Sequence, residues 1–165
     1  RLDNISEEEL AGMLYENSDE PYCEELAKAI TTEIRKGNRI DTTTKLRNVI
    51  EKTLDFLPNN KEKKDIIKKT CQRTFQALRI DVNNEFEVLY EFMEKLPGAL
   101  KPGGRVAILT FHSGEDKLVK KALKAGYKEG IYSEYARDVV RPSAQECSQN
   151  GRARSTKMRW AVKAE

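Results

Sequence analysis

Histidine and tryptophan occur only once each in this chain of 165 residues, and cysteine occurs three times. The cysteines, Cys23, Cys71 and Cys147, are odd in number and far apart, which fits reduced thiols rather than a disulfide framework. With His112 as the single histidine, no set of residues has the ligand spacing of a zinc site, and we expect no bound metal.

Long apolar runs are missing as well. No stretch approaches the roughly 20 residues that span a bilayer, and no signal-peptide pattern is present, so we expect a soluble protein without a membrane partner. The chain begins at Arg1 rather than methionine, which suggests a fragment or a processed chain. It also lacks a dinucleotide-binding glycine motif, a Walker loop and an internal repeat. No nucleophile and general base can be recognised from their spacing in the sequence.

Charge is distributed unevenly along the chain. Residues 1–57 carry a net charge of −5 and residues 58–165 a net charge of +8. The basic part is where a polyanion would bind. Its densest stretch, residues 61–69, holds five lysines. Lysines also cover solvated helix faces, so charge alone leaves both nucleic-acid binding and a plain solvated surface open.

Helix start signals recur in the first third of the chain. Ser6 with Glu9 forms a capping box, Pro21 suits the first turn of a helix, and Asp41 to Thr44 precede an apolar pattern. These signals predict three short amphipathic helices and a small helical subdomain that reaches about Leu57, without catalytic residues.

A long apolar stripe at three- and four-residue steps predicts a helix, with or without a kink, from Asn60 to Leu96. Gln76, Arg79 and Asn83 lie at the rim of this stripe, where polar groups need partners. Two interpretations stay open: these three side chains bind RNA, or they form hydrogen bonds with loops of their own domain.

The stretch from Leu100 to Lys121 reads as a turn, a buried strand, a bend and the start of a helix. Val106 to Leu109 is an unbroken apolar run, which predicts a parallel strand covered on both faces. Because ligands gather at the carboxyl ends of strands in α/β sheets, residues 110–116 form the first candidate site. The alternative is structural, since Ser113 with Asp116 also suits a helix N-cap.

The last part of the chain is basic and less regular. Residues 127–149 suggest a lid or an RNA-facing loop. The turn from Asn150 to Lys157 is rich in cations and precedes a final strand, Met158 to Val162, that contains Trp160. Guanidinium groups on a short turn suit phosphate recognition, although they equally suit a charged surface.

Three blocks, Arg73–Glu85, Pro102–Asp116 and Asn150–Arg159, together resemble the small-subunit ribosomal RNA cytosine-N4 methyltransferases of bacteria and organelles. The resemblance implies a helix-rich α/β fold: the C-terminal part of a Rossmann-like class I methyltransferase sheet plus a small all-helical subdomain. It assigns residues 1–68 to the inserted, RNA-facing helical subdomain and residues 69–165 to the C-terminal portion of the methyltransferase domain.

The same resemblance implies methyl transfer from S-adenosylmethionine to the exocyclic N4 of a cytidine in ribosomal RNA. The family's main cofactor loops have no counterpart in the chain, so the chain alone should be inactive. The family usually has leucine at Gly114, glycine at Ser18 and proline at Gly151. We do not expect these departures to change the reaction class.

By this resemblance, His112 and Ser113 are candidates for bordering the reacting cytidine, and Phe111 and His112 for touching the cofactor. No catalytic base is assigned. The implied RNA-binding residues are Arg73, Gln76, Arg79, Asn83, Arg152, Arg154 and Lys157.

The implied partners are small-subunit ribosomal RNA or the subunit itself, and the missing N-terminal half on the same or a separate chain. A homodimer is compatible with the sequence. The implied location is the bacterial cytoplasm or an organellar matrix or stroma. The alternative function is a non-catalytic, ribosome-associated RNA-binding module derived from the same family.

Overall fold

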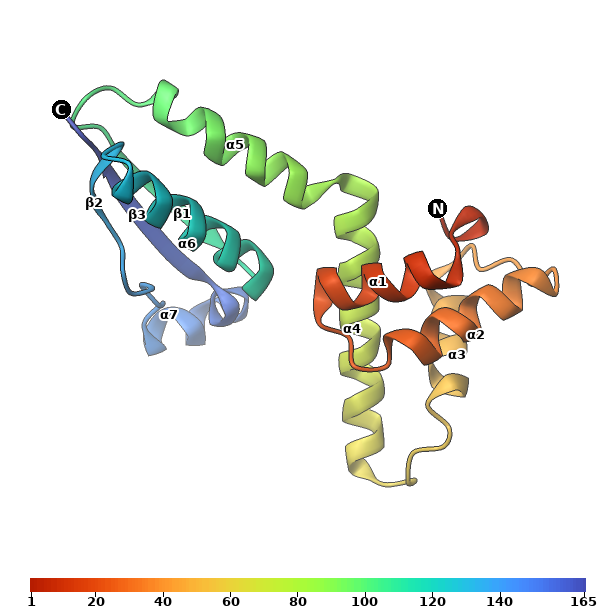
Figure 1. Ribbon diagram of the computed structural model, residues 1–165. Coiled ribbons are helices and arrows are strands. Elements are labelled where there is room, and N and C mark those ends of the chain that lie inside the picture. Colours follow the sequence, from red (N-terminus) through yellow and green to blue (C-terminus); the bar gives the residue numbers. More distant parts are fainter. The chain divides into compact units, whose positions relative to one another are not determined.

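The computed structural model describes all residues from Arg1 to Glu165, in two compact units (Figure 1). Arg1–Glu85 form the helical unit and Phe86–Glu165 form the sheet unit. The units therefore divide at residue 85, whereas the expected boundary at residue 68 falls inside a continuous helix, Lys61–Asn83 (α4). No helix in either unit is both long and apolar enough to cross a membrane.

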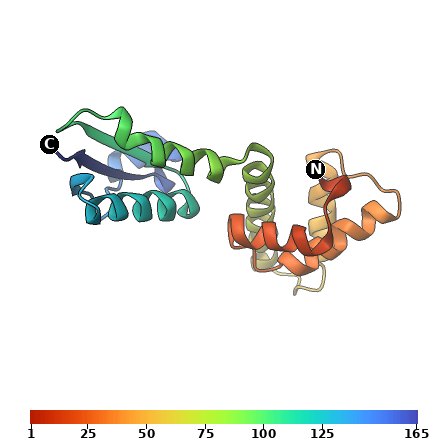
Figure 2. The same ribbon diagram turned by 45° about the horizontal axis from the view of Figure 1, so that its top comes forward.

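The helical unit starts with a short 3-10 turn, Leu2–Asn4 (η1), followed by α1 (Glu7–Ser18), α2 (Cys23–Arg35), α3 (Thr43–Thr53) and α4. The predicted start signals at Ser6 and around Thr42 are confirmed, whereas Pro21 lies in a turn two residues before α2 instead of in its first turn. The side chains of Ser6, Thr42 and Asn60 accept hydrogen bonds from backbone N–H groups three residues ahead, at 3.1, 3.2 and 3.0 Å. Helix α1 packs against both α2 and α4 (Figure 2), and α3 packs against the same two helices.

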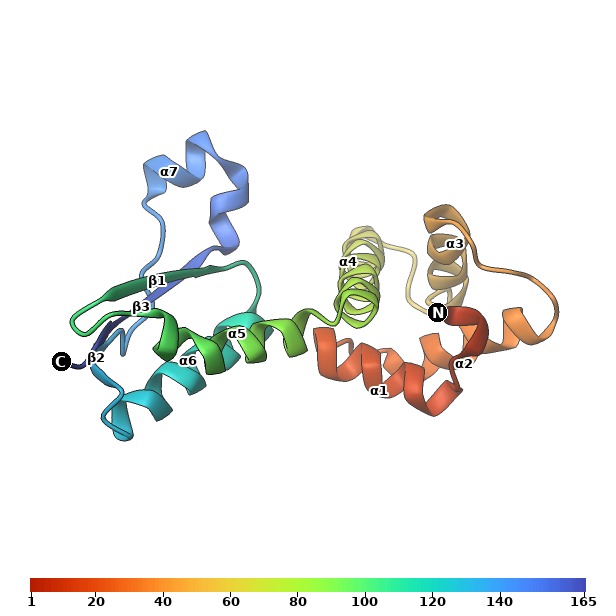
Figure 3. The ribbon, with the colours of Figure 1, turned by 90° about the horizontal axis from the view of Figure 1, so that it is seen from above.

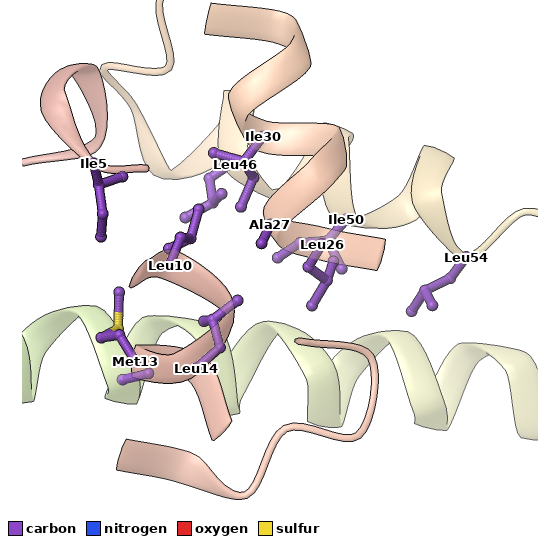
Figure 4. Packing of buried hydrophobic residues seen from close by; sticks show 11 residues of the cluster. Ile5, Leu10, Met13, Leu14, Leu26, Ala27, Ile30, Leu46, Ile50 and Leu54 are labelled. Carbon is purple, nitrogen blue, oxygen red and sulfur yellow. The ribbon is translucent and has the colours of Figure 1, made fainter. Parts of the chain in front are cut away.

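The core of the helical unit comes from one side of each helix. Leu10 and Leu14 of α1, Leu26 and Ile30 of α2, and Ile50 of α3 are fully buried and point toward one another (Figure 4). The two residues of each pair are four apart, which puts them on the same helix face. This spacing is the pattern that predicts the three amphipathic helices.

The long helix expected from Asn60 to Leu96 is two helices. Helix α4 ends at Asn83, Asn84 takes the left-handed conformation with φ of 50°, and α5 runs from Glu85 to Ala99. Asparagine tolerates this conformation better than most residues, which makes it a frequent helix terminator. The apolar stripe continues on both sides of the break, so its spacing does not reveal the break.

The sheet unit contains α5, β1 (Arg105–Thr110), α6 (Ser113–Lys128), β2 (Tyr132–Tyr135), α7 (Ala144–Gln149), a 3-10 turn, Gly151–Ser155 (η2), and β3 (Lys157–Lys163). The strand order is β1-β3-β2, and β3 is antiparallel to both neighbours. The helix-rich α/β fold is confirmed, as are the strands expected at β1 and β3. Strand β2 and helix α7 lie in the segment expected to be irregular.

The prediction that β1 is parallel and covered on both faces is wrong for this chain. Strand β1 pairs only with β3, antiparallel, and its side chains alternate between two different environments. Val106 and Ile108 pack into a core with residues of α5 and α6, which lie on one side of the sheet (Figure 3). Ala107 and Leu109 point to the other side, and Leu109 is 57% exposed.

Apolar residues of β3 share that other side. Ala107 pairs with Trp160 and Leu109 with Met158, and residues directly opposite in an antiparallel pair project from the same face. We call this surface, made by Ala107, Leu109, Met158, Trp160 and Val162, the open sheet face. It explains why the run Val106 to Leu109 is apolar on both sides of β1 although only one side is packed within the chain.

Candidate functional site

Two of the sequence blocks meet at one end of the sheet. Thr110, the last residue of β1, pairs with Lys157, the first residue of β3, and the Thr110 hydroxyl donates a 3.4 Å hydrogen bond to the Lys157 carbonyl. The bend at His112 and Ser113 therefore lies at the same end of the sheet as the cationic turn that precedes β3. This end is the candidate site.

His112 caps α6, in place of the cap expected at Ser113. Its Nδ1 accepts a hydrogen bond from the Glu115 N–H at 3.4 Å, and Glu115 Oε2 accepts one from the Phe111 N–H at 2.8 Å. This reciprocal arrangement is a capping box displaced by one residue, and Ser113 is the first residue of the helix. Because Nδ1 accepts, the proton of the neutral ring is on Nε2, which is 3.3 Å from Glu115 Oε1.

Phe86 covers the other side of the bend. Its ring lies edge-to-face with the His112 ring, with centroids 5.9 Å apart. A Cβ atom added at Gly114 would lie 2.7 Å from Phe86 Cζ and 3.2 Å from His112 Cε1. Glycine at this position therefore allows Phe86 to pack against the histidine.

We expect Gly114→Ala to displace the Phe86 ring from His112. Although alanine favours a helix by about 1 kcal/mol over glycine, the close contact with the ring should cancel that gain. Since His112 is the only histidine, its ring protons give a unique NMR signal that loses the ring-current shift of Phe86. Gly151→Ala, whose added Cβ would meet nothing within 4 Å, is the matched control. Unchanged His112 shifts in Gly114→Ala would contradict this packing.

A buried ion pair fixes α6 to β3 behind the bend. Arg159 Nε and Nη2 donate to the two carboxylate oxygens of Asp116 at 2.7 and 3.2 Å, and Lys157 Nζ lies 3.6 Å from Asp116 Oδ2. The hydrogen bond from Arg159 lowers the pKa of the Asp116 carboxyl below its usual range, against the opposing effect of burial. Arg159 is 5% exposed and also donates to the carbonyls of Ala136 and Arg137.

Asp116 therefore fixes a helix to the sheet rather than capping it. Its partner Arg159 is not among the site residues predicted from the sequence. The available signal was a cation within an otherwise apolar strand, between Met158 and Trp160.

The cationic turn presents two exposed guanidinium groups on a fixed backbone. The Asn150 side chain accepts a hydrogen bond from the Arg152 N–H at 3.1 Å, and Ala153 is buried under the turn. Arg152 and Arg154 are exposed, and neither takes part in a salt bridge. The turn can therefore hold an anion without breaking an existing ion pair. Lys157, by contrast, is half-buried beside Asp116.

The other predicted RNA-binding residues lie on α4 of the helical unit, and each has a partner there. Arg73 Nε donates to Glu20 at 2.6 Å, and Gln76 Nε2 donates to the Asn17 carbonyl at 3.5 Å. Arg79 and Asn83 donate to the Glu85 carboxylate at 2.8 and 3.3 Å. An RNA role for these four residues stays a prediction.

Comparison with known proteins places the whole chain within one family of sequences. A family model described as the MraW methylase family matches residues 1–164. A ribosomal RNA small subunit methyltransferase H 1 of Agathobacter rectalis is 88% identical over the entire chain, which covers 47% of that relative. A protein of the same name from Lachnoclostridium phytofermentans is 70% identical over 99% of the chain and 44% of the relative.

A more distant relative, ribosomal RNA small subunit methyltransferase H of Rickettsia prowazekii, is 36% identical over 98% of the chain and 56% of the relative. The chain thus spans about half the length of the curated relatives it matches.

Proposed function

Because the chain belongs to the MraW methylase family, we propose that it is part of an enzyme that methylates the exocyclic N4 of a cytidine in small-subunit ribosomal RNA, with S-adenosylmethionine as methyl donor. The observation that carries the proposal is the end of the sheet where the His112 bend and the Arg152–Arg154 turn meet. This end combines one wall of a site with two free cations for an RNA backbone. Because ribosomes are made in the cytoplasm of bacteria, the proposal places the enzyme there.

The open sheet face supports the view that the chain supplies only part of the catalytic domain. Methyltransferase sheets of the α/β class have helices on both faces, as do other largely parallel sheets. Here one face holds α5 and α6, whereas the opposite face exposes Leu109 and the β1 edge has no partner strand. The relatives are about twice as long, so the missing layer and neighbouring strand are assigned to the rest of the enzyme.

The groups at the candidate site do not by themselves fit S-adenosylmethionine. Ribose hydroxyls and an adenine amine need hydrogen-bond acceptors, and nucleotide sites usually supply a free carboxylate for the ribose. The two carboxylates here are engaged: Asp116 binds Arg159, and Glu115 binds the Phe111 N–H. The main cofactor pocket is therefore assigned to the rest of the enzyme, and this chain contributes one wall.

What the chain contributes is positioning. The exocyclic amine of cytidine is a poor nucleophile, because its lone pair is delocalised into the ring, so a fixed geometry accounts for much of the acceleration. The base must also leave its stack to be reached. In the proposal, Phe111, His112 and Ser113 border the extruded cytidine, and Arg152 and Arg154 hold phosphates beside it. Phe111 is 55% exposed and thus available for contact with a base.

Replacing Arg152 and Arg154 together with alanine should weaken RNA binding and flatten its salt dependence. Each lost phosphate contact removes about one unit from the slope of log affinity against log salt, so the expected change is about 1 to 2. The measurement is fluorescence anisotropy of a labelled single-stranded RNA at several salt concentrations. Lys120→Ala with Lys124→Ala removes the same charge from the exposed surface of α6 and is the matched control. Equal slopes for the two double variants would refute the RNA role of the turn.

A further inference from the structure

A groove in the helical unit lies outside the candidate site and has no assigned role. It has a volume of about 680 Å³ and runs between α3 and α4. Ile67, Cys71 and Phe75 of α4 form its floor, and Arg47, Lys64 and Lys68 stand at its rim. The floor residues are four apart in sequence, so they form one continuous stripe along the helix.

The floor is apolar and only partly covered. Ile67, Cys71 and Phe75 are each half-buried, although all three pack against the core of the helical unit. Burial raises the pKa of the Cys71 thiol, so this side chain is uncharged at neutral pH and adds to the apolar surface. A flat ligand part, such as a nucleobase, would cover apolar area here that water now contacts.

The rim carries an excess of positive charge. Glu51, the one acidic residue that lines the groove, accepts a 2.7 Å hydrogen bond from Arg47. Lys64 and Lys68 are exposed, form no salt bridge, and lie one helical turn apart. Two like charges at this spacing repel each other and slightly destabilise a helix, so an anion that bridges them would relieve a cost present in the free protein.

We propose that this groove binds a single-stranded segment of the RNA substrate, with one base on the apolar floor and the flanking phosphates on Lys64 and Lys68. The inference rests on the proposed function in taking RNA as the substrate, and it specifies a surface of the helical unit, separate from the predicted residues Arg73, Gln76, Arg79 and Asn83, that the RNA contacts. RNA fits better than a protein ligand because its backbone carries a phosphate at every nucleotide, so neighbouring phosphates of one strand can contact both lysines. Base stacking on exposed apolar and aromatic side chains also tolerates many sequences.

The first test compares two double charge reversals in the full 165-residue chain. Lys64→Glu with Lys68→Glu should weaken binding of a fluorescein-labelled single-stranded RNA of about 10 nucleotides by roughly 10- to 30-fold near 0.1 M salt, as expected for two lost phosphate contacts. Lys28→Glu with Lys52→Glu changes the net charge equally on the α2–α3 side of the helical unit and should weaken binding far less. If the reversal at the groove impairs folding, Lys64→Gln with Lys68→Gln replaces it.

The second test measures the accessibility of Cys71 on the groove floor. Bound RNA should slow alkylation of Cys71 by iodoacetamide, as measured by peptide mass spectrometry. Cys23, a half-buried thiol of the same unit that lines another cavity, should react at an unchanged rate. Slower reaction of both thiols would instead indicate general stabilisation of the unit and would count against the groove.

The proposal is overturned if the groove and control reversals weaken binding equally, or if saturating RNA leaves Cys71 reactivity unchanged. It is also overturned if the groove reversal abolishes a dimer in sedimentation while RNA affinity stays the same, since the groove would then bind a second copy. Each of these outcomes leaves methylation by the complete enzyme standing, because methyl transfer to ribosomal RNA is measured separately. Absence of RNA binding by the unmodified chain would also overturn the proposal that the groove binds RNA, and it too would leave methylation by the complete enzyme standing.

Discussion

Arg159→Ala is expected to destabilise the sheet unit by roughly 3 to 5 kcal/mol. The replacement leaves the Asp116 carboxylate buried without the two hydrogen bonds that now compensate its lost hydration. It also leaves the carbonyls of Ala136 and Arg137 without a donor. Lys157, 3.6 Å from Asp116, can take over part of the pairing, which favours the lower end of the range.

Urea unfolding followed by tryptophan fluorescence measures this loss, because Trp160 is the only tryptophan and lies on β3 of the sheet unit. Lys124→Ala on the exposed side of α6 is the control and should change stability by less than about 0.5 kcal/mol. The double replacement Arg159→Met with Asp116→Leu, which removes both charges, should be clearly more stable than Arg159→Ala. A loss below about 1 kcal/mol for Arg159→Ala would show that the pair does not hold β3 to α6.

The same pair gives stability a defined pH dependence. The pKa of Asp116 is lower in the folded chain than the usual value of about 3.9 expected after unfolding. Its contribution is therefore fully present above about pH 4 and is lost as the pH falls through the folded pKa. Arg159→Ala should remove this part of the acid sensitivity, so its stability curve below pH 4 should be flatter than that of the unmodified chain.

Arg73→Ala should destabilise the helical unit by a similar amount, roughly 3 kcal/mol. Glu20 is completely buried, and its carboxylate accepts hydrogen bonds from Arg73 Nε at 2.6 Å and from the Tyr22 N–H at 3.1 Å. Removal of Arg73 leaves that charge with a single neutral donor. The pair joins the turn between α1 and α2 to α4, so its loss affects the contacts among three helices.

Circular dichroism at 222 nm during urea unfolding follows this change, since the helical unit contributes four of the long helices. Lys69→Ala, an exposed residue on the same helix, is the control. RNA affinity of the folded variant separates the two roles considered for Arg73. Full stability with weaker RNA binding would assign it to RNA contact, whereas lower stability with unchanged RNA affinity would assign it to the Glu20 pair.

Local chemistry made much of the fold predictable. Caps such as Ser6 and Asn60 mark helix starts because the interaction involves residues three apart, and both are confirmed. Strand β2 could not be found in this way, since the Tyr132–Tyr135 stretch is short and half polar, and it is a strand only because β3 lies beside it. The parallel assignment of β1 failed for a related reason. An apolar strand is the same in sequence whether its second face is covered by its own chain or by another segment.

The candidate site was predictable where a motif lies within one turn and not where it depends on distant residues. The bend at His112 and the turn around Arg152 were found from sequence, and the register of Thr110 with Lys157 brings them to one end of the sheet. Local spacing pairs Asp116 with Ser113 in an N-cap, whereas its partner in the structure is Arg159, 43 residues away. Glu20 escaped notice for the same reason, since burial of a carboxylate shows only in three dimensions.

The most direct test of the proposed function is methyl transfer by a chimera. These 165 residues would replace the matching segment of the 88%-identical Agathobacter rectalis relative, whose remaining half would supply the other wall of the site. The assay measures N4-methylcytidine by mass spectrometry in small-subunit ribosomal RNA incubated with S-adenosylmethionine. We expect methylation at a rate close to that of the relative itself, and none from the 165-residue chain alone. A folded chimera that forms no N4-methylcytidine, under conditions where the relative does, would contradict the proposed function.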